Sequence, residues 1–286
     1  MSNIHDLGSR IQKMDLYEAI FCRKSVRNYR KSPVSQETQD EILHYFYEIP
    51  EVFGEINTAA AVCDNADGSV RMHLPGEVNA PYYLVFYSEK CVNDLMNIGY
   101  LIQQMSLFLC TRGFGACNVT NLQLRKDLQK KGTLQAMGML AFGVPAGPLT
   151  HKENEFNRLP LEKLCSYQEK PKEWTEQILR AARLAPSSGG SQPWRFVVTG
   201  EQIHVYTKKH KLDSMGRHRQ ESIDFGRLFA NIAIAAEALW IDVDLIRLGD
   251  IGEQFYPSSR YVLSVVLKNN KDVNVEMSTD ENFAGN

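Results

Sequence analysis

The cationic segment CRKSVRNYRKSPVS (residues 22–35) has side chains suited to binding a phosphate. The arginine guanidinium donates two parallel hydrogen bonds to a phosphate, and the hydroxyl of Ser25 offers a further donor. A short helical pattern precedes the segment, in which Asp15 is placed to cap and Leu16 and Ile20 share one face. Because a run of charges is most often a solvated turn, both interpretations stay open at this point.

The Ser/Gly segment, residues 186–192 within APSSGGSQPW (185–194), is the second candidate. Ser, Gly and Pro are the usual residues of turns, so a surface loop is one interpretation. The same composition lets a backbone pass close to a flat ligand with polar edges. The segment alone does not decide between a loop and a cradle for a ligand.

Two apolar helical patterns must position these segments. Apolar residues recur at three- and four-residue spacing along 98–109 and again along 225–236. Each apolar position of the first pattern has a counterpart in the second at one constant offset, which relates Ile98 to Phe225 and Gly99 to Gly226. Neither pattern has a strong polar face, which predicts that both helices are buried inside the domain or at an interface.

A second pair of segments supports an internal repeat. EILHYFYEIP (41–50) resembles QILRAARLAP (177–186), with Ile42 matching Ile178 at a slightly larger offset. Predicted strands follow at 82–88 and 194–200, and further strands follow the central helices at 139–145 and 261–268. We therefore predict two copies of a helix–strand–helix–strand unit joined near residues 150–172. A chance match between common helix patterns is the alternative.

The two halves have kept different segments. The cationic segment belongs to the first half and the Ser/Gly segment to the second. If the halves pack against each other as two subunits of a symmetric dimer do, these segments face one another. The sequence thus predicts one composite site built from both halves.

Both segments carry a resemblance to the FMN-dependent nitroreductase family. LYEAIFCRKSVRNYRKSPVSQETQDEIL resembles the opening of that family, with R-x-S-x-R followed by Pro-Val and a helix. ILRAARLAPSSGGSQPWRFVV resembles its A-P-S-S-G-N-x-Q-P-W segment. In ordinary members both motifs lie consecutively in one chain, and a homodimer forms two FMN sites. Here the motifs lie far apart, one in each half, so the chain is similar to single-chain, pseudo-dimeric nitroreductases.

This resemblance implies an α+β nitroreductase-like fold of two fused half-repeats, residues 1–165 and 166–286, each with a helix-flanked mixed or antiparallel sheet. It implies one FMN between the halves, and NAD(P)H-dependent reduction of nitroaromatic, quinone or similar acceptors by a ping-pong mechanism. We expect no separate catalytic side chain, because the flavin carries the chemistry. The alternatives are a non-catalytic flavin-binding or sensing protein, and a specialised dehalogenase or dehydrogenase on the same fold.

Residue by residue, the resemblance implies that Arg23 and Ser25 hold the FMN phosphate and that Arg27 approaches the pyrimidine end of the ring. The match of FNRLPLEKL to the closing R-x-P segment of the family adds Arg158 at the phosphate. Gly190 stands where the family has Asn, which removes one flavin hydrogen bond, and Trp194 is expected in the core. The full set of expected FMN-binding residues is Arg23, Lys24, Ser25, Arg27, Arg158, Pro186, Ser187, Ser188, Gly189 and Gln192, with Ala116, Cys117 and Asn118 from a predicted Gly-rich turn at 111–119.

The composition limits the remaining possibilities. The chain has 286 residues, is 43% hydrophobic and has a net charge of −2, which is typical of a soluble globular protein and offers no basic surface for nucleic acid. Six scattered cysteines without a C-x-x-C pair indicate reduced thiols, and neither a signal peptide nor an apolar run of membrane-spanning length is evident. We expect a cytoplasmic monomer that holds no metal. We expect it to bind NAD(P)H and a small-molecule oxidant, and to bind neither nucleic acid nor a membrane.

Overall fold

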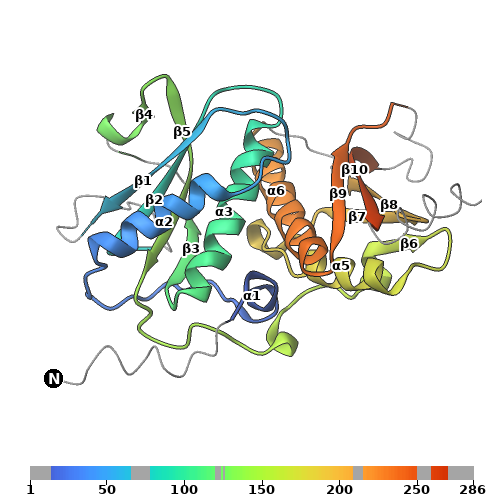
Figure 1. The fold of residues 1–286 in the computed structure, drawn as a ribbon, viewed down its shortest axis with the longest axis horizontal. Helices are drawn as coiled ribbons and strands as arrows, with labels where there is room; N and C mark the ends of the chain where they lie inside the picture. Colours follow the sequence, from blue (N-terminus) through green and yellow to red (C-terminus); the bar gives the residue numbers. More distant parts are fainter. Residues whose placement is uncertain are drawn as a thin grey trace, which may run out of the picture.

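The computed structural model describes residues 14–65, 78–119, 124, 126–208, 215–249 and 259–269. Two β-sheets lie on opposite sides of a central pair of long helices, α3 (Asp94–Thr111) and α6 (Met215–Ala238) (Figure 1). All residues from Asn97 to Cys110 of α3 are buried, and so are most of those in the second half of α6. The prediction of two buried central helices is therefore confirmed.

The first sheet contains four strands in the order β1-β2-β5-β3 and a short fifth strand beside β5. All of its described pairings are antiparallel. The strands are β1 (Thr58–Asp64), β2 (Tyr82–Ser88), β3 (Gly115–Val119), β4 (Lys130–Lys131) and β5 (Leu134–Gly143).

The second sheet has five strands in the order β6-β7-β8-β10-β9. Its described pairings are antiparallel except for the parallel pair β6 and β7. The strands are β6 (Cys165–Tyr167), β7 (Trp194–Thr199), β8 (Gln202–Lys208), β9 (Ile241–Ile246) and β10 (Ser259–Asn269). The mixed and antiparallel sheets expected for an α+β protein are present.

The two halves share one topology. Helix α2 (Gln36–Glu48) precedes β1, β2, α3, β3 and β5, and helix α5 (Glu173–Arg183) precedes β7, β8, α6, β9 and β10 in the same arrangement. Even the register agrees, because Gly115 pairs with Gly143 in the first half, and Ile241 pairs with Asn269 at the equivalent positions of the second. The four main strands of the second half, β7, β8, β10 and β9, therefore repeat β1, β2, β5 and β3 of the first, whereas β4 and β6 have no counterpart.

The structure corrects the predicted repeating unit. Each half has two strands on either side of its central helix, whereas the sequence predicted one. The match of 82–88 to 194–200 was wrong, because β2 is the second strand of its half and β7 is the first. The counterpart of β7 is β1, and the offset between their first residues equals the one that matches Ile42 to Ile178 in the preceding helices. The alanine-rich β1, with its sequence TAAAVCD, lacks the bulky residues that mark a strand.

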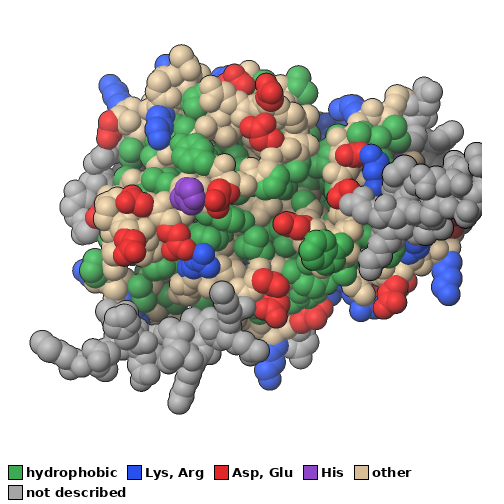
Figure 2. Space-filling view, in the orientation of Figure 1, with side chains coloured by type: hydrophobic (Ala, Val, Ile, Leu, Met, Phe, Trp, Pro, Cys, Tyr) green, Lys and Arg blue, Asp and Glu red, His purple; other side chains and the backbone are tan. Residues whose placement is uncertain are grey.

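The remaining helices are short and flank the central pair. Helix α1 (Leu16–Cys22) has Asp15 as its N-cap residue. The Asp15 side chain accepts a hydrogen bond from the backbone N–H of Glu18 at 2.7 Å, as its predicted capping role requires. The predicted connection at 150–172 also contains regular structure, namely helix α4 (Leu161–Leu164) and strand β6. Within the described part of the chain, no helix combines the length and apolarity needed to cross a membrane. On the face in Figure 2, acidic and basic side chains are interspersed over the described residues.

Candidate functional site

The cationic segment runs from the end of α1 along the edge of the first sheet. Arg23 is the C-cap residue of α1 and forms an isolated β-bridge with Thr150. Ser25 forms a bridge with Ala116 of β3, and the backbone N–H of Val26 donates to the Ala116 carbonyl at 3.0 Å. Three of the predicted site residues, Arg23, Ser25 and Ala116, are thus brought together by backbone pairing.

The side chains of this segment have different exposures. Arg23 is 8% exposed, Lys24 is half-buried, and Ser25 and Arg27 are exposed. Burial lowers the pKa of the Arg23 guanidinium, while the thiols of Cys110, Cys117 and Cys22 act in the opposite direction. Among the described residues, none accepts a hydrogen bond from this guanidinium. A buried cation without such a partner is unfavourable unless a ligand supplies one.

Arg158 approaches the same place from the segment between the two halves. Its Nε atom is buried without a hydrogen-bond partner, and Nη1 makes only a long contact of 3.4 Å with the Asn157 carbonyl. Burial lowers the pKa of Arg158, and the positive charges of Arg23 and Arg183 lower it further. Arg158 and Arg23 therefore form a pair of neighbouring cations, as the predicted phosphate site requires.

The Ser/Gly segment is a tight turn that is fixed from within. The Ser187 Oγ accepts a hydrogen bond from the Gln192 N–H at 2.9 Å, and the Gln192 side chain donates to the Arg183 carbonyl at 3.2 Å. The Gln192 Oε1 also accepts from the Leu159 N–H at 2.7 Å. Gln192, at 2% exposed, therefore connects the turn to the residue that follows Arg158. Its predicted role as a polar support agrees with these contacts.

Two glycines give the turn its shape. Gly189 and Gly190 have φ angles of 60° and 69°, in the left-handed region that glycine and asparagine adopt most readily. At both positions no described atom lies within 4 Å of the place that a Cβ would take. The Gly190 present and the Asn that the resemblance leads us to expect at this position therefore suit the same backbone conformation. Trp194, which follows, is fully buried and lies edge-on to Phe225, as expected of a core residue.

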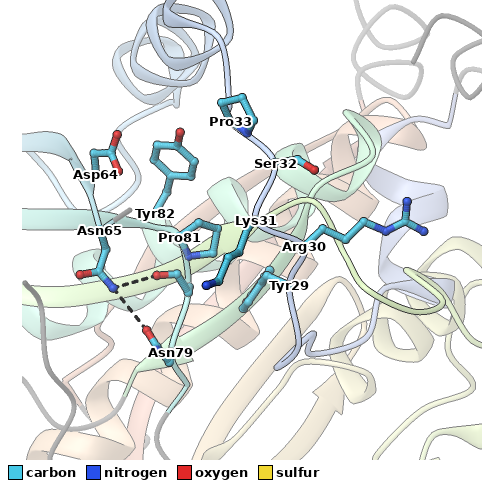
Figure 3. Close-up of a pocket in the computed structure, with 11 residues that line it drawn as sticks. Tyr29, Arg30, Lys31, Ser32, Pro33, Asp64, Asn65, Asn79, Pro81 and Tyr82 are labelled. Carbon is cyan, nitrogen blue, oxygen red and sulfur yellow. Dashed lines mark hydrogen bonds between the residues drawn. The ribbon is translucent and has the colours of Figure 1, made fainter. Parts of the chain in front are cut away.

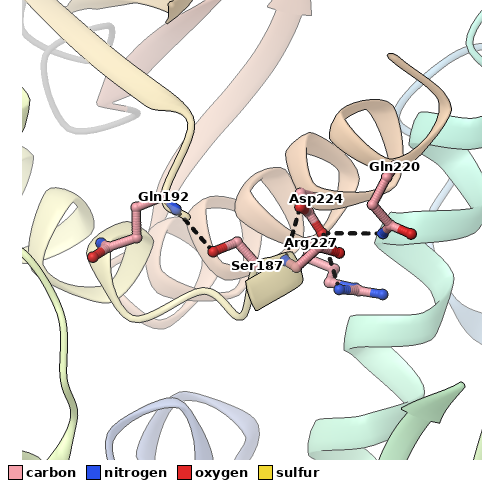
Figure 4. Close-up of polar contacts among 6 residues, drawn as sticks. Ser187, Gln192, Gln220, Asp224 and Arg227 are labelled. Carbon is pink, nitrogen blue, oxygen red and sulfur yellow. Dashed lines mark hydrogen bonds and ion pairs between the residues drawn. The ribbon is translucent and has the colours of Figure 1, made fainter. Parts of the chain in front are cut away.

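Asp224 of helix α6 holds the Ser/Gly segment from the other side (Figure 4). Its carboxylate accepts hydrogen bonds from the Ser188 N–H at 2.9 Å, the Ser188 Oγ at 3.3 Å, the Gln220 side chain at 3.4 Å and the Arg227 Nη1 at 3.1 Å. Burial raises the pKa of Asp224, and Arg227 and the hydrogen bonds counteract this. The sequence analysis missed both Asp224 and Arg227. An Asp-x-x-Arg pair at i, i+3 at the start of the apolar stretch of this helix was the signal available.

The Gly-rich turn predicted at 111–119 is mostly a strand. The turn itself is confined to Arg112 and Gly113, and Ala116, Cys117 and Asn118 belong to β3, where they pair with β5. For residues 115–119 the prediction of a turn was wrong, because they form β-sheet hydrogen bonds with strand β5. The glycines in this segment had suggested a turn instead of a strand. Cys117 is buried, which raises its pKa, and the charges of Arg27, Arg23 and Arg227 oppose this shift. Asn118 lines a cavity of about 140 Å³ together with Arg219 and Gln220 of α6.

A larger pocket of about 640 Å³ lies at another place in the first half (Figure 3). Tyr29, Lys31 and Tyr82 line it, and the Asn65 side chain donates to the Asn79 Oδ1 at 3.3 Å within it. None of the expected FMN-binding residues is among its lining residues. The volume of this pocket therefore gives no support to the expected cofactor-binding residues.

The assembled site is strongly cationic. The guanidiniums of Arg23, Arg158 and Arg227 influence one another electrostatically, and among the described carboxylates only Asp224 is bonded to any of them. Charged groups away from water require partners, so this arrangement is suited to binding an anion such as a phosphate. Within the described residues, no group of His, Cys, Asp and Glu is suited to holding a metal ion, and none of the six cysteines forms a disulfide bond.

Comparison with known proteins gives the following matches. The sequence matches the model of a family described as "Putative TM nitroreductase" over residues 15–236. The structure resembles that of a "putative nitroreductase" from Thermotoga maritima with a TM-score of 0.60 and 18% identity, covering 91% of this chain and 95% of that one. No curated protein matches the sequence.

Two further solved structures cover about half of this chain. One is a "Putative NADH dehydrogenase/NAD(P)H nitroreductase" from Bacteroides thetaiotaomicron, 17% identical, with a TM-score of 0.43 and coverage of 54% of this chain and 98% of that one. The other is an "FMN-dependent Nitroreductase" from Clostridium difficile, 18% identical, with a TM-score of 0.39 and coverage of 47% of this chain and 91% of that one.

Proposed function

Because the chain belongs to the family described as TM nitroreductase, we propose that it is an FMN-dependent oxidoreductase that uses NAD(P)H to reduce nitroaromatic, quinone or similar acceptors. The observation that carries the proposal is the lack of hydrogen-bond acceptors for two arginines. The buried Nε of Arg158 has no partner among the described residues, and no described residue accepts a hydrogen bond from the guanidinium of Arg23. Guanidinium groups in this state fit the phosphate of FMN, since phosphate offers acceptors in a geometry that matches their donors.

The expected residues divide the cofactor between the two halves. Arg23 and Arg158 bind the phosphate, with Lys24 and Ser25 beside them, and Arg27 approaches the pyrimidine end of the ring. From the second half, Pro186, Ser187, Ser188 and Gly189 lie along the ring, supported by Gln192. Strand β3 contributes Ala116, Cys117 and Asn118. The hydrogen bond from the Leu159 N–H to the Gln192 Oε1, which links the residue after Arg158 to the Ser/Gly segment of the second half, supports this composite site.

FMN supplies the hydride and electron transfer when it is bound, so the side chains need not include an acid, a base or a nucleophile. The residues of this chain bind the cofactor, orient it and set the charge around it. The cavity beside Asn118 offers space next to β3 for a second molecule. We propose a ping-pong order, in which the oxidised nicotinamide leaves before the acceptor enters.

The composite site implies an internal duplication. We propose that residues 1–165 and 166–286 are fused halves that arose from one gene, which the shared strand order and register support. The pairing of α3 with α6 then takes the place of a subunit interface, so we expect a monomer. Light scattering during size-exclusion chromatography tests this expectation, and a stable dimer would contradict it. A cytoplasmic location is also a prediction, which cell fractionation tests.

Anaerobic reduction of the FMN-loaded protein tests the proposed activity. We expect NADH or NADPH to abolish the visible absorption of the flavin, and an added quinone or nitroaromatic compound to restore it. Bound flavin that neither nicotinamide reduces would instead indicate a flavin-binding or sensing protein. Restoration by a single class of acceptor in a panel would indicate a specialised enzyme, such as a dehalogenase.

A further inference from the structure

We propose that Arg227, on the central helix α6, is an additional cofactor-binding residue that contacts an anionic group of FMN together with Arg23. This inference rests on the proposed function and extends it. Arg227 lies outside all the segments that resemble the nitroreductase motifs, and it belongs to the half of the chain that does not carry the cationic segment.

Arg227 is buried, and its hydrogen bonding is incomplete. The residue is 3% exposed, and neither Nε nor Nη2 has a hydrogen-bond partner in the described part of the chain, while Nη1 reaches the Asp224 carboxylate at 3.1 Å. A guanidinium has five N–H donors, and buried donors without acceptors are strongly unfavourable. A bound anion that accepts from Nε and Nη2 would remove this deficit.

The Asp224 carboxylate accepts several other hydrogen bonds, so it cannot provide acceptors for all the donors of Arg227. The same carboxylate also accepts from the Ser188 N–H, the Ser188 Oγ and the Gln220 side chain. These bonds orient the carboxylate toward the Ser/Gly segment, so it holds one edge of the guanidinium and leaves the other donors available (Figure 4). Asp224 thus fixes Arg227 in place beside the proposed ring-binding turn.

The local charge balance also requires an anion. Burial lowers the pKa of Arg227, Asp224 raises it, and the positive charge of Arg23 lowers it again. Arg23 has no acceptor among the described residues, and its positive charge also lowers the pKa of Arg158. Three cations beside one carboxylate leave an excess of about two positive charges, which a dianion such as a phosphate ester neutralises.

The equivalent position in the first half shows that this arrangement exists once among the described residues. The offset that relates the two central helical patterns matches Arg227 to Tyr100 and Asp224 to Asn97. The Tyr100 hydroxyl accepts a hydrogen bond from Gln104 at 3.1 Å, and its ring lies edge-on to Phe53. An uncharged, packed tyrosine at this position offers no counterpart to the Arg227 site, so the inference predicts one FMN for each chain.

FMN titration of three variants tests the inference. Arg227→Met removes the charge, and the double variant Asp224→Asn with Arg227→Met removes both members of the ion pair, so that no buried charge is left uncompensated. Arg112→Met is the matched control, because it breaks an exposed arginine–carboxylate pair with Glu41 elsewhere on the molecule. Circular dichroism and thermal unfolding establish that each variant is folded, and FMN fluorescence gives the dissociation constants.

We expect both Arg227 variants to bind FMN about 10- to 100-fold more weakly than the wild type, and the control to bind normally. Riboflavin, which lacks the phosphate, identifies the group contacted. A loss confined to FMN places Arg227 at the phosphate, and an equal loss with both ligands places it at the pyrimidine edge of the ring. Wild-type affinity in the folded double variant would overturn the inference and leave the proposed function intact, whereas a wild-type chain that does not bind FMN would overturn both.

Discussion

Gly99 and Gly226 occupy equivalent positions on the two central helices, and each lies directly against the backbone of the other helix. A Cβ on Gly99 would lie 2.0 Å from the carbonyl oxygen of Ile223, and one on Gly226 would lie 1.9 Å from that of Met96. Met96 and Ile223 are themselves equivalent, because the offset between them along the chain is the one that relates the two glycines. The contact is therefore reciprocal, as at a two-fold axis, and it brings together the two halves that form the composite site.

Replacement of either glycine should destabilise the protein. Alanine favours a helix over glycine by about 1 kcal/mol, but here its methyl group would overlap a backbone carbonyl that cannot rotate away. We expect Gly99→Ala to lower the free energy of unfolding by about 1–3 kcal/mol or more, measured by urea denaturation. Gly147→Ala is the control, because no described atom lies within 4 Å of the added Cβ. A Gly99→Ala protein as stable as the wild type would contradict the close helix contact.

Substitutions at position 190 should change the stability only through the backbone conformation that each residue prefers. Gly190 is exposed and has a φ of 69°, with no described atom near its Cβ position. Gly190→Asn should therefore leave stability nearly unchanged, whereas Gly190→Val should lose about 1–2 kcal/mol. Thermal unfolding of the two variants makes the comparison, and equal stabilities would show that the left-handed conformation is not maintained in solution.

His204 should make stability depend on pH. This side chain is 2% exposed, and its Nδ1 lies 2.7 Å from the Ser264 Oγ, which in turn lies 2.7 Å from the Tyr261 hydroxyl. Burial lowers the pKa of His204 below the ordinary value of 6.5, so the folded state favours the neutral ring. As the pH falls below 6.5, the unfolded chain takes up the proton first, and stability decreases by at most about 1.4 kcal/mol for each pH unit.

Urea denaturation at several pH values between 7.5 and 5 measures this effect. The His204→Gln variant should show a smaller loss of stability across this range, since an amide does not titrate. His44→Gln serves as the control, because the side chain of His44 is largely exposed. Identical pH profiles for the wild type and the His204 variant would contradict the prediction.

The sequence predicted the central helices, the cap at Asp15, strand β2 and the burial of Trp194, because each depends on a local pattern that the fold preserves. It did not reveal β1, whose alanines have little preference for strands. It also did not reveal the extended conformation of residues 115–119, because the glycines on either side of Phe114 indicated a turn. The pairing that makes these residues strands involves partners distant in the chain.

The candidate site was predictable only where it resembled known motifs. Arg23, Arg158 and the Ser/Gly segment were nominated from their sequence context, whereas Asp224 and Arg227 lie in a helical segment that the sequence analysis treated only as apolar. Their role depends on which groups the fold leaves unpartnered, and that becomes visible only when the two halves are assembled. For the same reason, Gln192 could be nominated from its sequence, but its three hydrogen bonds could not.

The central claim is that Arg23 and Arg158 bind the phosphate of one FMN, and a fluorescence titration with FMN tests it most directly. The account predicts one FMN for each wild-type chain, with binding about tenfold or more weaker in Arg23→Met and in Arg158→Met, and unchanged in Arg112→Met. A wild-type chain that does not bind FMN, or folded Arg23 and Arg158 variants that bind it as tightly as the wild type, would contradict the account.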